Sequence, residues 1–81
     1  MPIELLILTP QGPAFRGSVE SVVLPGSEGD FGVLASHERF ATPLRVGELR
    51  IEKGSQTLYA AIAAGFADVS GAEVAVLVES C

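Results

Sequence analysis

Apolar and polar residues alternate along two short stretches of this 81-residue chain. Within residues 48–52, Leu49 and Ile51 alternate with charged side chains, and valine occupies every second position of residues 74–78. A period of two places alternate side chains on opposite faces of an extended chain. Both stretches are therefore predicted to be β-strands with one buried face.

Three further stretches are rich in apolar residues without a helical period: residues 3–8, 19–24 and 31–34. The second is apolar on both faces, which predicts a strand near the centre of a sheet. Residues 9–13 end the first stretch, because the two prolines in Thr-Pro-Gln-Gly-Pro exclude a helix there.

Turn signals separate these stretches about every eight to twelve residues, as is typical of sandwiches and barrels. Residues 52–55 (Glu-Lys-Gly-Ser) predict a hairpin turn into residues 56–59, and Ser70-Gly71 predicts a later turn. We therefore expect one all-β domain spanning residues 1–81.

Residues 58–64 test this interpretation, because Leu-Tyr-Ala-Ala-Ile-Ala-Ala has the composition of a helix. The segment nevertheless follows a predicted hairpin turn, has no N-capping box and ends at Gly65. Small side chains also suit a strand where two sheets approach closely. We interpret the segment as a strand.

The net charge of −5 argues against nucleic acid as a partner. Binding to phosphates requires clustered basic side chains, whereas the four arginines and one lysine are scattered along this chain. A basic partner fits better. Hydrophobic residues make up 48% of the sequence, so either the core is rich or part of the apolar surface meets another protein.

Neither a membrane span nor an internal disulfide is expected. The longest apolar candidate, residues 58–67, is half of the ~20 residues that a spanning helix needs. The start of the chain shows no pattern of a signal peptide, since Glu4 interrupts it. Cys81 is the sole cysteine and is compatible with a reducing compartment.

Residues 24–34 (Leu-Pro-Gly-Ser-Glu-Gly-Asp-Phe-Gly-Val-Leu) predict a rigid, exposed acidic loop between two strands. The glycine spacing suggests a phosphate loop only superficially. The Lys-Ser/Thr of such a loop is absent, and Glu28 and Asp30 would repel phosphate. We interpret the loop as a docking surface whose glycines permit a tight connection.

The sequence offers no group that suits catalysis. His37-Glu38 does not begin a zinc-protease motif, because position 41 is alanine, and a lone histidine supplies too few metal ligands. Nothing apolar surrounds Glu28 and Asp30 that would raise a carboxyl pKa toward catalysis. The serines lack a nucleophile elbow. We expect a chain that is not an enzyme and that binds no cofactor or metal.

Several motifs with fixed spacing extend over nearly the whole chain, from about residue 5 to residue 78. They are Phe15-x-Gly17-x-Val19-Glu20-x-Val22, residues 24–34 with His37, Leu44-x-x-Gly47-x-Leu49-x-Ile51, Gly65-Phe66-Ala67-Asp68-Val69 and Val74-x-Val76-Leu77. This pattern resembles the epsilon subunit of F-type ATP synthases.

The resemblance implies a ten-stranded β-sandwich of two antiparallel sheets. It further implies a non-catalytic rotor subunit of the central stalk, which docks the gamma subunit onto the c-ring and couples proton translocation to ATP synthesis. The expected location is the cytoplasmic face of an energy-transducing membrane, in particular a bacterial plasma membrane. The chain would contact that membrane only through the complex.

The resemblance also assigns candidate contact residues. The residues expected to face the c-ring are Ser27, Glu28, Gly29, Asp30 and His37. Those expected to face the gamma subunit are Thr9, Pro10, Phe40 and Thr42.

Two departures from the family pattern carry expectations of their own. Residues 35–42 read Ala-Ser-His-Glu-Arg-Phe-Ala-Thr where the family usually has Pro-Gly-His-Ala-Pro-Leu-Leu-Thr, so a local repacking is expected. Most members continue past the position of Cys81 into two helices. If the chain is complete, we expect that it cannot inhibit ATP hydrolysis by inserting a helix.

One alternative comes from another functional class. Domains that carry biotin or lipoate are also small, acidic and all-β, with a lysine at a hairpin tip, and Lys53 is at a predicted tip. The carrier motif places Met or Asp before that lysine and Ala or Met after it, whereas Glu52 and Gly54 flank Lys53. A biotinyl or lipoyl mass increment on Lys53 would favour the carrier.

Overall fold

The computed structural model describes residues 2–33 and 37–80, in which every regular element is a strand. The nine strands are β1 (Ile3–Thr9), β2 (Gly12–Val19), β3 (Ser21–Gly26), β4 (Gly29–Val33), β5 (His37–Leu44), β6 (Gly47–Lys53), β7 (Gln56–Ile62), β8 (Gly65–Gly71) and β9 (Glu73–Val78). No helix within these two ranges is long and apolar enough to cross a membrane.

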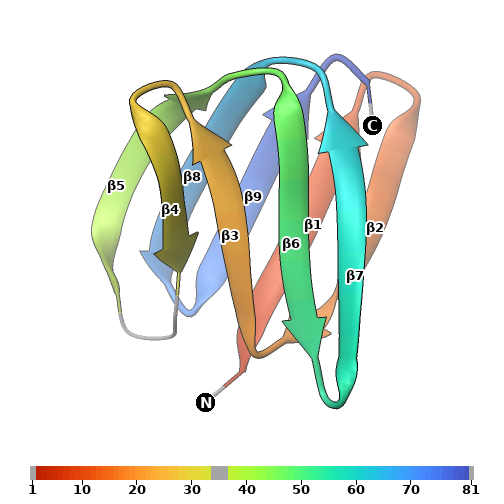
Figure 1. Cartoon of the computed structure of the whole chain (residues 1–81), viewed down its shortest axis with the longest axis vertical. Coiled ribbons are helices and arrows are strands. Elements are labelled where there is room, and N and C mark those ends of the chain that lie inside the picture. Colours follow the sequence, from red (N-terminus) through yellow and green to blue (C-terminus); the bar gives the residue numbers. More distant parts are fainter. Residues whose placement is uncertain (1, 34–36, 81) are drawn as a thin grey trace.

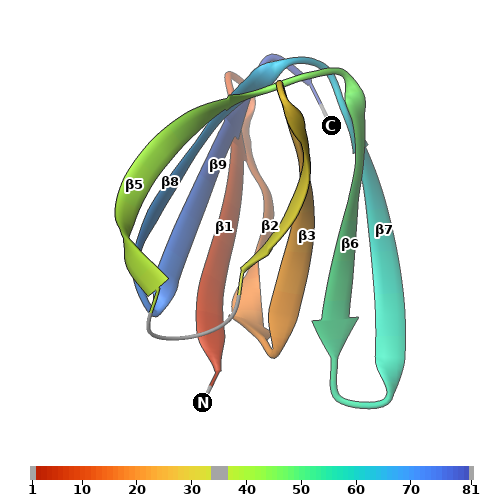
Figure 2. The same ribbon diagram turned by 60° about the vertical axis from the view of Figure 1, so that its left-hand side comes forward.

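The strands form two packed layers (Figure 1). One layer has the order β2-β1-β9-β8-β5, and the other contains β4, β3, β6 and β7. The turned view in Figure 2 separates the two layers. The predicted all-β sandwich is confirmed.

Three details differ from the expected pair of antiparallel sheets with ten strands. The described residues contain nine strands, and the layers are joined into one path of strand pairing where Leu44 of β5 pairs with Gly26 of β3. Pairing continues past this point, because the amide of Arg45 donates to the carbonyl oxygen of Pro25 at 2.9 Å. In addition, β1 pairs with β9 in parallel.

The alternation read from the sequence sets the core. Leu49 and Ile51 of β6 are buried, as are the three valines of β9, while the charged neighbours on β6 point outward or are half-buried. No polar or charged side chain within the described ranges is buried. The core consists of Ile3, Leu5, Ile7, Val19, Val22, Leu24, Val33, Leu44, Leu49, Ile51, Ile62, Ala67, Val69, Val74, Val76 and Val78.

The alanine-rich segment is a strand over residues 58–62, as predicted, whereas residues 63 and 64 follow its end. It belongs to β7, which pairs with β6 in antiparallel register. Leu58 and Ala60 pack against the core while Tyr59 is exposed. Period-two burial, made possible by pairing with β6, thus outweighs the weak helical preference of the alanines.

Three strands, β2, β5 and β8, are not predicted from the spacing of apolar residues and turns. Of these, β2 and β5 each contain a proline, which removes a hydrogen-bond donor from the ladder. Pro13 is tolerated because β2 is the last strand of its layer, and the register with β1 shifts just before the pair Leu8–Pro13. Pro43 lies near the end of β5, where the strand passes from one layer to the other.

The two ends of the sandwich carry different connections. The β1–β2 turn and the β3–β4 hairpin tip lie at one end, shown at the top of Figures 1 and 2, where the described chain also finishes. The β6–β7 hairpin and the β8–β9 turn lie at the opposite end.

Candidate functional site

The acidic loop of the sequence is a tight hairpin tip. Gly26 of β3 pairs with Gly29 of β4, so only Ser27 and Glu28 lie between the strands. Gly29 has a φ of 136°, which side chains disfavour. We call residues 27–30 the acidic tip. It is shorter and more regular than the loop predicted, because the flanking residues continue the strand ladder.

Arg45 ties the acidic tip to the rest of the sandwich. Its Nη2 atom lies 2.6 Å from Oδ1 of Asp30, and its Nη1 atom donates to the carbonyl oxygen of Gly26 at 2.8 Å. The amide of Ser27 also donates to the carbonyl oxygen of Pro43 at 3.2 Å. The tip is therefore held by the end of β5 and by the segment that connects β5 to β6.

Two aromatic rings, those of Phe31 and Phe40, pack beside the acidic tip. The ring of Phe31 lies so close to Gly26 that a Cβ atom at position 26 would be 2.9 Å from it and 2.6 Å from the carbonyl oxygen of Gly29. Phe31 in turn meets Phe40 edge to face, with ring centroids 5.8 Å apart. Glycine at position 26 is a steric requirement.

A depression of about 390 Å³ lies beside the acidic tip. Residues 26–31 form one side of it, and Thr42 and Pro43 of β5 form the other. The structure therefore brings four of the expected c-ring contacts, residues 27–30, together on one exposed feature. It also places Thr42, an expected gamma contact, next to them.

His37 is not near the acidic tip along the fold. It is the first residue of β5 and pairs with Gly71 beside the β8–β9 turn, whereas Leu44, the last residue of β5, pairs with Gly26. Seven residues of extended chain correspond to about 20 Å. The backbone of His37 thus belongs to the other end of the sandwich, and its side chain lies outside the described residues.

The expected gamma contacts separate into two groups. Thr9 ends β1 and Pro10 begins the β1–β2 turn, whereas Phe40 and Thr42 lie on β5 beside the acidic tip. Thr9 is held in its turn by a hydrogen bond from its hydroxyl to the carbonyl oxygen of Gly12 at 2.9 Å. The two groups therefore offer separate contacts.

Thr9 and Pro10 line an apolar groove that the sequence analysis did not identify. Its volume is about 390 Å³. Its floor is a row of outward side chains on three strands, because Leu8 pairs with Leu77 and Leu77 pairs with Phe66. Phe66 is 57% exposed and Leu77 is 47% exposed. The many apolar residues of the chain thus form an exposed apolar surface as well as a core.

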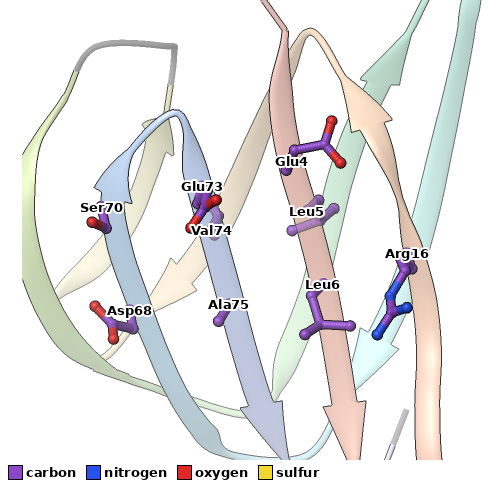
Figure 3. A pocket seen from close by; sticks show the side chains of 9 residues that line it. All are labelled: Glu4, Leu5, Leu6, Arg16, Asp68, Ser70, Glu73, Val74 and Ala75. Carbon is purple, nitrogen blue, oxygen red and sulfur yellow. The ribbon is translucent and has the colours of Figure 1, made fainter.

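A second depression, of about 350 Å³, lies on the same sheet (Figure 3). Glu4, Asp68 and Glu73 stand around a floor formed by Leu6 and neighbouring apolar residues, with Arg16 on the β2 side. Glu4 accepts a hydrogen bond from the hydroxyl of Ser18. The mixed charges and exposed position give this depression no evident catalytic arrangement.

The described residues offer no candidate site for a metal ion or a cofactor. Within residues 2–33 and 37–80 no three histidine, cysteine or carboxylate side chains cluster as metal ligands would. Lys53, the candidate modification site, ends β6, and its Nζ atom lies 6.0 Å from the centroid of the Phe15 ring. Cys81 lies outside the described residues.

Comparison with known families gives one match over almost the whole chain. Residues 2–81 match the family described as the ATP synthase delta/epsilon chain, beta-sandwich domain. This agrees with the resemblance read from the sequence motifs.

Similar proteins come from bacteria and from a mitochondrial complex. The chain is 42% identical over 77 residues to the ATP synthase epsilon chains of Helicobacter acinonychis and Caulobacter vibrioides. These matches cover 95% of this chain, 63% of the Helicobacter protein and 90% of the Caulobacter protein.

Among solved structures, a chain of the Euglena gracilis mitochondrial ATP synthase, in a structure of OSCP, F1 and the c-ring, superposes with a TM-score of 0.91. The sequence identity is 27%, and the match covers 98% of this chain and 51% of that one.

Proposed function

This chain belongs to the delta/epsilon chain family of ATP synthases, and from that premise we propose that it is a central-stalk subunit joining the gamma subunit to the c-ring. In this role it couples proton translocation to ATP synthesis by transmitting rotation. The membership itself, together with its epsilon-chain relatives, assigns the chain to a non-catalytic subunit. Its place is then the cytoplasmic face of a bacterial plasma membrane, reached only through the complex.

The observation that carries this proposal is the presence of two chemically different surfaces at one end of the sandwich. The acidic tip presents charge, whereas the groove with Phe66 and Leu77 presents apolar area. Both lie toward the end that contains the β1–β2 turn (Figure 1). A subunit that joins two partners needs two such surfaces.

We assign the apolar groove, with Thr9 and Pro10, to the gamma subunit. Burial of apolar area contributes roughly 25 cal/mol per Å², whereas an exposed ion pair contributes only about 0–1 kcal/mol. The groove can therefore supply most of the affinity. Phe40 and Thr42 lie beside the acidic tip and would mark the boundary between the two contacts.

We assign the acidic tip to the c-ring, where it would meet a basic loop. The tip is short and tied at several points, so little conformational entropy is lost when it docks. Its contribution is register and specificity more than affinity. The backbone of His37 pairs with Gly71 at the other end of the sandwich, away from this contact.

The family match counts against the alternative that Lys53 carries biotin or lipoate. An intact-mass measurement tests this alternative, because an unmodified mass agrees with the central-stalk proposal. A biotinyl or lipoyl increment on Lys53 would contradict it.

Two exposed aromatic residues allow a matched test of the groove. Phe66→Ser should weaken binding to the isolated gamma subunit by about tenfold, since the variant removes a large apolar contact. Tyr59→Ser is the control, because Tyr59 is similarly exposed, at 61%, but lies on β7 of the other layer. Equal losses for both variants, or no loss for either, would contradict the assignment of the groove.

The acidic tip is tested by pull-down with the c-ring. Glu28→Lys should reduce capture by the c-ring while capture by the gamma subunit is retained. Unchanged capture by both partners would remove the assignment of the acidic tip.

A further inference from the structure

We propose that Arg45 is the positioning residue of the acidic tip, and that Glu28, not Asp30, is the carboxylate that the tip presents to its partner. This inference rests on the proposed function, because it assumes that the tip docks. The inference gives different roles to Glu28 and Asp30, which the sequence alone does not distinguish.

Arg45 reaches the tip at two points with one side chain. Its guanidinium meets Asp30 at 2.6 Å and the carbonyl oxygen of Gly26 at 2.8 Å, while its own amide donates to Pro25. A planar guanidinium donates in fixed directions, so two such contacts define where the tip stands. Arg45 is thus bound to both strands of the hairpin.

The charge on Asp30 is consequently compensated within the chain. The side chains of Arg45 and Asp30 are 48% and 60% exposed, so their pair remains hydrated and adds little stability. For a partner, however, the pair is close to neutral. A cation approaching Asp30 would also meet the guanidinium of Arg45.

Glu28 differs in this respect. It is one of the two residues between the strands, it is exposed, and its carboxylate takes part in none of the hydrogen bonds or ion pairs found among the described residues. The tip therefore offers one uncompensated negative charge at its apex. The matching partner surface is a loop with a single basic side chain opposite the apex.

The decisive experiment exchanges the two members of the pair. The whole 81-residue chain is titrated into ATP synthase complex from which the resident epsilon chain has been removed. Asp30→Ala and Arg45→Gln should each weaken binding about two- to threefold, because each loosens the tip. Glu28→Gln should weaken binding more, by about fivefold, because it removes a direct contact.

The exchanged variant carries both Asp30→Arg and Arg45→Asp. It should bind no worse than either single variant, because an ion pair again spans the same two positions, although a carboxylate at position 45 cannot replace the hydrogen bond that Arg45 donates to Gly26. If Asp30 contacted the partner directly, an arginine there would repel the partner's cation, and the exchanged variant would bind worse than either single variant. That result would overturn the inference.

Amide hydrogen exchange in the free chain gives a second readout that needs no partner. Arg45→Gln should speed exchange at the Ser27 amide, which donates to Pro43, whereas Glu28→Gln should leave it unchanged. Equal exchange rates in the wild type and Arg45→Gln would contradict the positioning role. Melting temperatures measured in parallel show whether either variant acts through global stability.

The two proposals fail in different ways. If the wild-type chain does not bind the stripped complex, the central-stalk role fails, and the exchange rate at Ser27 still decides the positioning role. If the wild type binds and the exchanged variant binds worse than either single variant, the central-stalk role stands and the role of Arg45 falls.

Discussion

The two hairpin tips at opposite ends of the sandwich have the same length and different support. In β3–β4 the turn is Ser27-Glu28, and in β6–β7 it is Gly54-Ser55, between the pair Lys53–Gln56. The first is bound by Arg45 and lies on the Phe31–Phe40 pair. The second has a long cation–aromatic approach from Lys53 to Phe15 and, one residue pair from the turn, a hydrogen bond from the hydroxyl of Thr57 to the carboxylate of Glu52 at 2.7 Å.

A glycine beside the acidic tip adds to the contrast. A Cβ atom at Gly26, the last residue of β3, would meet a backbone oxygen and an aromatic ring, whereas a Cβ atom at Gly29 or at Gly54 would meet nothing within 4 Å. Gly54 is required only by its φ of 60°. A tip that must present a charge in a defined place is held by packing and hydrogen bonds, whereas an ordinary turn needs only the right backbone conformation.

The largest expected effect is that of Gly26→Ala, which should lower the free energy of unfolding by about 2 kcal/mol. The new Cβ atom would lie 2.6 Å from the Gly29 carbonyl oxygen, so the backbone must shift. Urea denaturation measures the change. Gly32→Ala is the control, because its nearest neighbour would be 4.0 Å away, and it should change stability by less than about 0.5 kcal/mol. Equal effects would contradict the steric account.

Gly54→Ala should lower the free energy of unfolding by about 1 kcal/mol, because alanine disfavours the left-handed conformation. Gly54→Asn should lower it less, since asparagine adopts this conformation more readily. The same denaturation experiment compares them. A loss for Asn as large as that for Ala would show that something other than φ restricts this position.

Arg45→Gln should lower the free energy of unfolding by less than about 1 kcal/mol, because the ion pair with Asp30 is exposed. Its larger consequence should be local, at the amides of the acidic tip. Chemical denaturation combined with hydrogen exchange separates the two. A global loss well above this value would place Arg45 among the residues on which the whole fold depends.

The smallest expected effect is that of Lys53→Gln, the corresponding charge removal at the other tip. An exposed cation about 6 Å from a ring contributes roughly 0.5 kcal/mol, so the free energy of unfolding should change by no more than that. Thermal unfolding checks it. A larger change than that of Arg45→Gln would reverse the contrast between the tips.

Much of the fold could be predicted because its signals are local. The strand with Leu49 and Ile51, the valines of β9 and the turn at Gly54 follow from the spacing of apolar residues and turn formers. The alanine-rich strand was predicted from its neighbours in sequence. In the first three elements, the local preference and the final structure agree; in the alanine-rich strand, pairing with β6 overrides a helical preference.

What the sequence could not predict depends on residues distant along the chain. Residues 37–44 show no alternation and contain Pro43, and they become β5 by pairing with β8. Leu8, Phe66 and Leu77 form one groove only through the register of three strands. Arg45 and Asp30 are separated by fifteen positions, and five basic residues offered no way to select this pair.

The parallel pairing of β1 with β9 has a consequence for how the protein is made. β1 finds its neighbour, residues 74–77, only after those residues have been made, because β9 lies next to β1 in the layer. Contacts of such long sequence separation form slowly. Released chains that stop before residue 73 or after residue 78 should therefore differ in protease resistance. Until β9 is available, one edge of β1 is unpaired, and the apolar side chains of Leu5 and Ile7 are incompletely buried in the nascent chain.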